Sequence, residues 1–165
     1  MRYTLQRGLL EVRARTGAPD TVARFPKLTG HIDFDPDAPG RAAVELIVDL
    51  RILDTGERLA SWTIKGAIDA DAHPTATFTL SRVREVREET AGRFVASAVG
   101  QLRWRGRAVD VQVTGRGTVD RGSVDATARF TLDVRQLGVE PPKLLLPDVD
   151  GVVAVAVSLR AIATR

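Results

Sequence analysis

The chain has 165 residues, of which 44% are hydrophobic and 27% are charged, which fits a single globular domain with a sizeable core. Its 24 basic and 21 acidic residues nearly cancel to a formal net charge of +3, so it lacks the unopposed cations that nucleic-acid binding requires. The absence of cysteine excludes disulfides and thiol chemistry.

Segments of alternating apolar and polar residues follow one another along the chain, with turn residues between them. A period of two residues predicts antiparallel strands with one buried face. The predicted strands are 8–15, 28–34, 42–51, 75–86, 93–104, 107–116, 123–134 and 151–162. About eight strands at this spacing predict one all-β domain over 1–165, built as an antiparallel sandwich or barrel.

Segment 56–72 lacks this alternation and separates the third predicted strand from the fourth. It contains Trp62, Ile64 and Ile68, and it fits either a short helix or an irregular loop. In a barrel, either structure would cap one end.

Two predicted strands have small residues in the middle of their inward faces and bulky residues toward the ends. The inward residues are Phe94, Ala96, Ala98, Gly100, Leu102 and Trp104 in the first strand, and Val124, Ala126, Ala128, Phe130, Leu132 and Val134 in the second. A closed sheet whose interior side chains are this small would have spare volume and could hold an apolar molecule. The alternative is that opposing walls interdigitate, large against small, and fill the core.

The last predicted strand, 151–162, is apolar on both faces. Its alternate residues Val153, Val155 and Val157 would face the interior, which leaves an outer face that begins with Val152. We therefore expect this outer face to be covered, for example by a second subunit in a homodimer.

Five short motifs, in this order, resemble those of the YceI-like family. They are Gly30-His31-Ile32-Asp33-Phe34-Asp35-Pro36, Leu53-Asp54-Thr55-Gly56, Pro74-Thr75-Ala76-Thr77-Phe78, Gly100-Gln101-Leu102-Arg103-Trp104-Arg105-Gly106, and the segment 132–139. The resemblance implies a lipocalin-like antiparallel barrel, often dimeric, which holds a polyisoprenoid chain such as a quinone tail and is not an enzyme. The sequence departs from the family pattern at Gly8-Leu9, Ala67-Ile68 and His73. These changes thin out the expected aromatic wall.

The candidate ligand-binding residues are inward apolar side chains together with the tryptophan of segment 56–72. They are Trp62, Ala76, Phe78, Leu80, Phe94, Ala96, Ala98, Leu102, Trp104, Ala126, Ala128 and Phe130. Arg103, Arg105 and Arg107 surround a predicted turn and are candidates for holding a pyrophosphate or quinone head group. A solvated turn is the alternative for these arginines.

Signals for catalysis and metal binding are weak. The sequence has no nucleophile elbow and no glycine-rich phosphate loop. Its two histidines, without cysteine, are too few for an ordinary zinc site. Asp33, Asp35 and Asp37 alternate as in a calcium loop, but Ala38 stands where that loop needs glycine. We therefore expect no enzymatic activity, no metal and no cofactor other than a bound lipid.

The predicted function is sequestration of an isoprenoid or similar apolar lipid, as a carrier or store. The alternative is a non-catalytic interaction protein, whose filled barrel docks a partner through the apolar outer face of 151–162. No apolar run is long enough to span a membrane, and the first residues lack the apolar core of a secretory signal. We therefore expect a cytoplasmic protein, or a periplasmic one if a leader has been removed.

Overall fold

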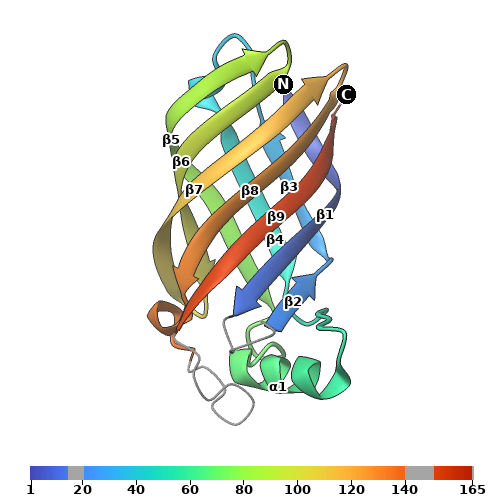
Figure 1. Cartoon of the computed structure of the whole chain (residues 1–165), viewed down its shortest axis with the longest axis vertical. Helices are drawn as coiled ribbons and strands as arrows, with labels where there is room; N and C mark the ends of the chain where they lie inside the picture. The colour runs from blue at the N-terminus through green and yellow to red at the C-terminus, as the bar shows by residue number, and fades with distance from the viewer. Residues whose placement is uncertain (15–20, 140–150, 165) are drawn as a thin grey trace.

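The computed structural model describes residues 1–14, 21–139 and 151–164. Within these ranges, nine antiparallel strands form one sheet, which closes into a barrel where β1 pairs with β9 (Figure 1). The strands are β1 (Arg2–Ala14), β2 (Thr21–Phe25), β3 (Leu28–Asp33), β4 (Ala43–Asp49), β5 (Thr75–Thr90), β6 (Arg93–Trp104), β7 (Arg107–Asp120), β8 (Ser123–Asp133) and β9 (Val152–Ala163). The predicted all-β, lipocalin-like barrel is therefore confirmed.

Strands β2 and β3 share one position in the barrel wall. One edge of β1 pairs with β9 along most of its length. The other edge pairs with β3 through residues 2–4 and with β2 through residues 10–14. The result is a closed barrel of eight strands with one extra strand.

Strand β1 begins earlier than the sequence pattern predicted, at Arg2 instead of residue 8. The register between β1 and β9 shifts between Leu5 and Arg7. This irregularity exchanges the inward and outward positions. Before it, Tyr3 and Leu5 share one face at odd-numbered positions, and after it Leu10 continues that face at an even-numbered position. The break in phase hides the first part of the strand from a search for regular alternation.

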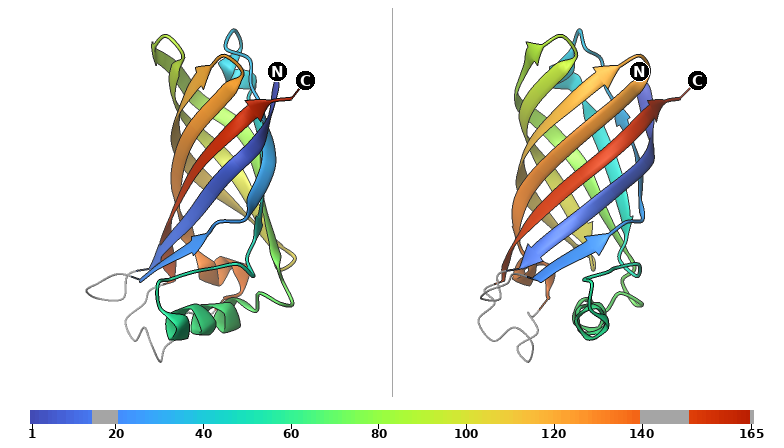
Figure 2. Two further views of the ribbon diagram at one scale, coloured as in Figure 1. Left: turned by 90° about the vertical axis from the view of Figure 1, so that its right-hand side faces the viewer. Right: turned by 45° about the vertical axis from the view of Figure 1, so that its right-hand side comes forward.

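Helix α1 (Arg58–Ile68) lies across one end of the barrel (Figure 2), so the helix alternative for segment 56–72 is correct. Short 3-10 helices follow β3, at Pro39–Arg41, and β8, at Val134–Leu137. The second of these replaces the strand expected at Val134. The N and C termini meet at the opposite end of the barrel from α1 (Figure 1).

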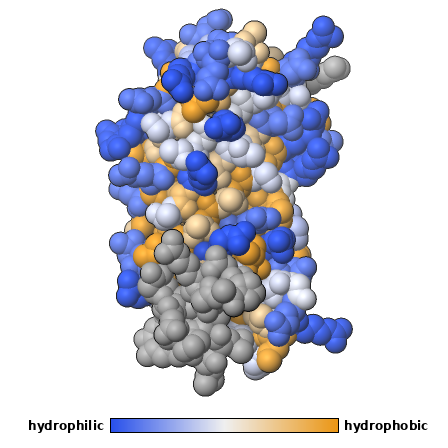
Figure 3. Space-filling view, viewed as in Figure 1, coloured by the Kyte–Doolittle hydropathy of each residue, from blue (hydrophilic) through white to orange (hydrophobic). Residues whose placement is uncertain are grey.

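Strand β9 alternates as expected. Val153, Val155 and Val157 are buried, whereas Val152 and the alanines that follow it on the outer face are exposed. In the space-filling view, apolar residues occupy the middle of this side of the barrel between hydrophilic margins (Figure 3).

Candidate functional site

The half of the barrel next to α1 is hollow. It contains a cavity of about 340 Å³ with contributions from every strand of the sheet and from the helix. Among the described residues, every lining side chain apart from those of Thr21 and Thr127 is apolar. A filled core was the alternative to a container, and the cavity rules out a filled core in this half of the barrel.

Small residues on β8 leave free space, and a glycine on β6 makes room for an aromatic ring. Ala126 and Ala128 line the cavity from β8, where larger side chains would reach toward the opposite wall. On β6, the absence of a side chain at Gly100 leaves room for the ring of Phe78. That ring stacks with Phe130, with centroids 6.3 Å apart and planes inclined by 17°. The two rings, from β5 and β8, form an aromatic part of the wall.

Helix α1 closes the mouth of the cavity with one apolar face. Ile64, Ala67 and Ile68 line the cavity, as the i, i+3, i+4 spacing of a helical face allows. No residue of the helix is buried. Elements with so little buried surface open at a lower free-energy cost than the core does, so α1 is suited to act as a lid.

Two hydrogen bonds from the β6–β7 turn hold the segment at the C-terminal end of α1. Trp104 Nε1 donates to the carbonyl oxygen of His73 at 2.9 Å, and Arg105 Nη1 donates to that of Ile68 at 3.0 Å. Arg105 also lies 5.3 Å from the centre of the Trp104 ring. A cation at a helix C-terminus is favourable because it opposes the negative end of the helix dipole. Trp104 and Arg105 therefore fasten the lid to the wall.

The three candidate head-group arginines lie on or beside this turn but do not line the cavity. Arg105 is engaged with Ile68, and Arg103 Nε donates to Gln101 Oε1 at 2.8 Å. The guanidinium of Arg107 lies against Gly138. A head-group role for these arginines stays a prediction.

The other half of the barrel, beside the termini, is filled. Tyr3, Ile32, Val124 and Ala161 form a separate buried cluster there. Phe94 is only 7% exposed. Its ring meets that of Phe34 edge to face, with centroids 5.1 Å apart. These side chains plug this end of the lumen.

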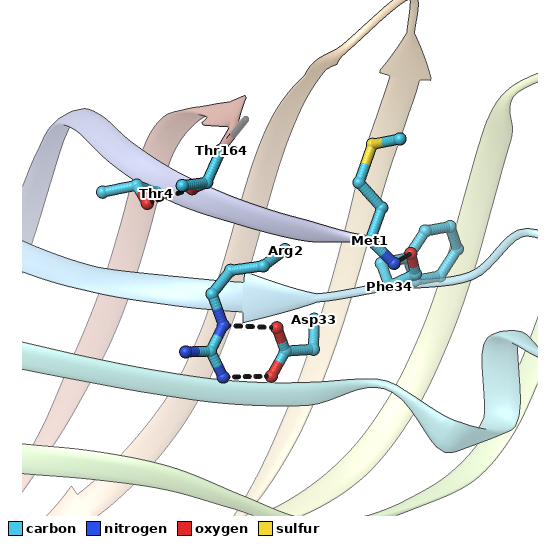
Figure 4. A network of polar contacts seen from close by, with 6 residues as sticks. All are labelled: Met1, Arg2, Thr4, Asp33, Phe34 and Thr164. Carbon is cyan, nitrogen blue, oxygen red and sulfur yellow. Dashed lines mark hydrogen bonds and ion pairs between the residues drawn. The ribbon is translucent and has the colours of Figure 1, made fainter.

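Polar contacts at the edge of the filled half hold the N-terminal end of β1 against β3 (Figure 4). Arg2 donates two hydrogen bonds to the Asp33 carboxylate, at 2.8 and 2.9 Å. The hydrogen bond from Arg2 holds the pKa of the Asp33 carboxyl below its ordinary value. The ammonium group of Met1 donates to the carbonyl oxygen of Phe34 at 3.2 Å. These contacts join the start of β1 to the end of β3.

The structure places most of the predicted ligand-binding residues on the cavity wall. Those residues are Ala76, Phe78, Leu80, Leu102, Trp104, Ala126, Ala128 and Phe130. Phe94 belongs to the plug, and Ala96 and Ala98 do not line the cavity. The expectation that Trp62 lines the cavity is wrong, because its side chain is 75% exposed on α1.

Sequence reasoning missed part of the wall. The missed residues include Leu10 and Val12 on β1, Phe25 on β2, and Leu137 and Val139 after β8. Leu10 and Val12 lie within the predicted strand 8–15, beyond the register break, but they were not among the candidate residues. Phe25 lies on a five-residue strand that is too short for alternation to stand out.

None of the described residues that line the cavity has an ionisable side chain. Among residues 1–14, 21–139 and 151–164, no polar or charged side chain is buried. In the same ranges, no group of three or more histidine, aspartate or glutamate side chains is placed to hold a metal ion. The helices in the described part of the chain are too short or too polar to cross a membrane. What the cavity offers a ligand is therefore apolar contact.

Solved structures with the same fold come from several bacteria. Burkholderia cenocepacia BcnA has a TM-score of 0.76 at 18% identity, over 93% of this chain and 96% of that one. A polyisoprenoid binding domain from Saccharophagus degradans, implicated in plant cell wall breakdown, has a TM-score of 0.75 at 14% identity, over 98% of both chains. A Campylobacter jejuni YCEI protein has a TM-score of 0.65 at 14% identity, over 87% and 85% of the two chains.

No curated protein sequence matches the chain significantly. At these identities, the structural likenesses establish the fold alone. The sequence pattern of the YceI-like domain, however, matches residues 4–161, nearly the whole chain. The chain therefore belongs to the YceI-like family.

Proposed function

We propose that the protein binds the tail of an isoprenoid, such as a prenyl quinone, or of a similar long apolar lipid, and serves as its carrier or store. The observation that carries this proposal is the cavity of about 340 Å³ with an almost entirely apolar wall. Binding sites for small molecules commonly measure about 300–1,000 Å³ and are mostly apolar. Because the described part of the wall has no buried charged side chain, it favours a hydrocarbon and penalises a polar ligand, which would lose its hydrogen bonds to water.

The hydrophobic effect alone supplies enough free energy for this function. Each buried CH₂ group contributes about 0.8 kcal/mol, so one five-carbon unit contributes a few kcal/mol at most. Ordering the chain and the side chains around it reduces this gain. A tail of several units therefore binds without any directional contact.

The fold family supports the same assignment. The structurally similar domain from Saccharophagus degradans is described as binding polyisoprenoids. This chain belongs to the YceI-like family and has a hollow barrel half that suits such a ligand.

The lipid is expected to enter at the α1 end, because the cluster around Tyr3 and Ala161 fills the other end. Its head group would then lie near the β6–β7 turn, where Arg103 and Arg107 are within reach of solvent. Arg105 would reach a head group only by releasing its hydrogen bond to Ile68.

The test is native mass spectrometry after mild purification, followed by titration with a prenyl quinone in detergent solution. The wild-type protein should carry a lipid adduct or take up the quinone. Ala128→Phe fills the cavity and should weaken uptake at least about tenfold, equal to 1.4 kcal/mol. The control, Ala154→Phe, adds the same ring on the exposed face of β9 and should leave uptake unchanged. Repeated preparations without an adduct, together with no uptake of the quinone, would contradict the proposal.

A second candidate function is docking of a partner or a second copy on the outer face of β9. It is favoured by the exposure of Val152, Ala154 and Ala156 along this strand. Sedimentation of wild type and Ala154→Arg tests it, since a charge in a packed interface is costly. A mass that is monomeric in both proteins would count against a homodimer through this face.

A further inference from the structure

Helix α1 has a second face that does not contribute to the cavity. Ile64, Ala67 and Ile68 face the cavity, whereas Leu59 and Trp62 are 56% and 75% exposed. With 3.6 residues per turn, Leu59 and Trp62 fall on the side of the helix opposite Ile64. An amphipathic helix in a globular protein ordinarily presents polar residues on that side. Two large apolar residues exposed on that side of the helix indicate a binding surface.

The charged residues on this face of α1 are all basic. Arg58 and Lys65 flank Trp62, at i−4 and i+3, and Arg58–Ile68 contains no aspartate or glutamate. Glu57 and Asp69 lie at the caps, outside the helix. Within the described ranges, neither cation has an ion-pair partner.

Helix stability does not account for Arg58. It occupies the first turn, where the helix dipole disfavours a cation. The residue therefore carries an electrostatic cost for the isolated helix, and a nearby anionic surface would offset that cost.

We propose that the outward face of α1, formed by Arg58, Leu59, Trp62 and Lys65, docks on the surface of an anionic lipid bilayer. Tryptophan and leucine enter the interfacial region of a bilayer, and the flanking cations are attracted to anionic head groups. The proposal rests on the proposed function, because docking through α1 would hold the cavity mouth against the source of an apolar lipid.

A second copy of the chain is a poorer occupant of this face. Pairing two α1 faces would set Arg58 and Lys65 against like charges, which is unfavourable. The apolar area on one short helix is also small beside the roughly 800 Å² that each partner buries in a stable protein interface. A bilayer needs no shape complementarity from the helix.

Exposed apolar residues at the two ends of the barrel provide a matched control. Ile52, 46% exposed, lies on the segment leading to α1, whereas Ile162, 41% exposed, lies at the end of β9 beside the termini. If exposure alone caused membrane binding, both ends would contribute. The proposal assigns binding to the α1 end only.

The experiment is flotation of the full chain with vesicles of phosphatidylglycerol and phosphatidylcholine that contain no isoprenoid. Wild type should float with these vesicles and bind pure phosphatidylcholine vesicles at least about tenfold more weakly. High salt should weaken the binding. The double variant Leu59→Ser/Trp62→Ser and the double variant Arg58→Glu/Lys65→Glu should each lose at least about tenfold, whereas Ile162→Ser should bind as wild type does.

Uptake of a prenyl quinone from detergent solution separates this proposal from the proposed function. Normal uptake by Leu59→Ser/Trp62→Ser, with vesicle binding lost, supports docking through α1 and shows that the variant is folded. Vesicle binding by wild type that equals that of this variant would overturn the proposal. So would wild-type self-association that the same variant abolishes, because a second copy would then be the occupant. Failure of wild-type uptake bears on the proposed function alone.

Discussion

The two halves of the barrel share one sheet but differ in how their interiors are filled. Beside the termini, Tyr3 and Ile32 belong to one buried cluster, and the rings of Phe34 and Phe94 pack edge to face. Toward α1, Ala128 lines a cavity that no described side chain fills. The comparison shows that, within one sheet, the size of the inward side chains decides whether the protein fills the barrel interior or leaves room for a ligand.

The largest expected effect is on stability, in a matched pair of phenylalanine deletions. Phe94→Ala removes a buried ring from the filled half and should lower the free energy of unfolding by about 3–5 kcal/mol. Phe78→Ala removes a half-buried ring that borders a cavity, so the loss should be about 1–2 kcal/mol. Urea denaturation of both variants measures the difference. Equal losses would mean that the two halves are packed alike.

The reverse change, adding a ring, tests the same contrast. Ala161 is 0% exposed within the plug, so Ala161→Phe should overpack it and cost about 1–3 kcal/mol of unfolding free energy. Ala128→Phe places its ring in the cavity and should cost less than about 1 kcal/mol. Thermal unfolding of the two proteins provides the measurement. A larger loss for Ala128→Phe would show that the hollow half has no room to spare.

A glycine substitution refines the description of the hollow half. A side chain at Gly100 would collide with the Phe78 ring, so Gly100→Ala should displace that ring and cost about 1–2 kcal/mol of unfolding free energy. Gly66 on α1 has open space around its Cα, and Gly66→Ala should stabilise the helix by about 0.4–1 kcal/mol. Urea denaturation should therefore shift in opposite directions for the two variants. A neutral Gly100→Ala would indicate that Phe78 moves freely.

The smallest expected effect is the pH dependence from ion pairs at the two ends. Hydrogen bonds from Arg2 and Arg135 hold the pKa values of Asp33 and Asp133 below their ordinary range. The unfolded state therefore binds protons first as the pH falls, so this contribution to stability is complete above about pH 4 and is lost below it. Chemical denaturation between pH 7 and pH 2 should show the loss, reduced in Asp33→Asn and in Asp133→Asn. Stability that rises on acidification would contradict this sign.

The sequence predicted the barrel wall well where alternation is regular. Strand β6 begins at Arg93 and ends at Trp104 as expected, because its apolar and polar residues alternate without a break. The small residues of β8 also pointed correctly to free interior space. Strand β1 was only partly found, since its register break between Leu5 and Arg7 exchanges the two faces.

Trp62 shows the limit of sequence reasoning at the site. An aromatic residue in segment 56–72 fits a cavity wall, but the rotation of α1 about its axis is set by its contact with the barrel. That contact directs Ile64 and Ile68 to the cavity and leaves Trp62 in solvent. The same rotation created the cationic, apolar face proposed to meet a bilayer.

The sequence by itself determined the strand pattern, the antiparallel all-β class and the scarcity of polar groups inside, because period-two alternation encodes which face of each strand is buried. Only the tertiary structure decided which end is hollow and which is plugged. That depends on which side chains meet across the axis, as Phe34 meets Phe94, and these partners lie far apart in the chain. Their meeting is set by barrel closure and strand register, which no local pattern contains.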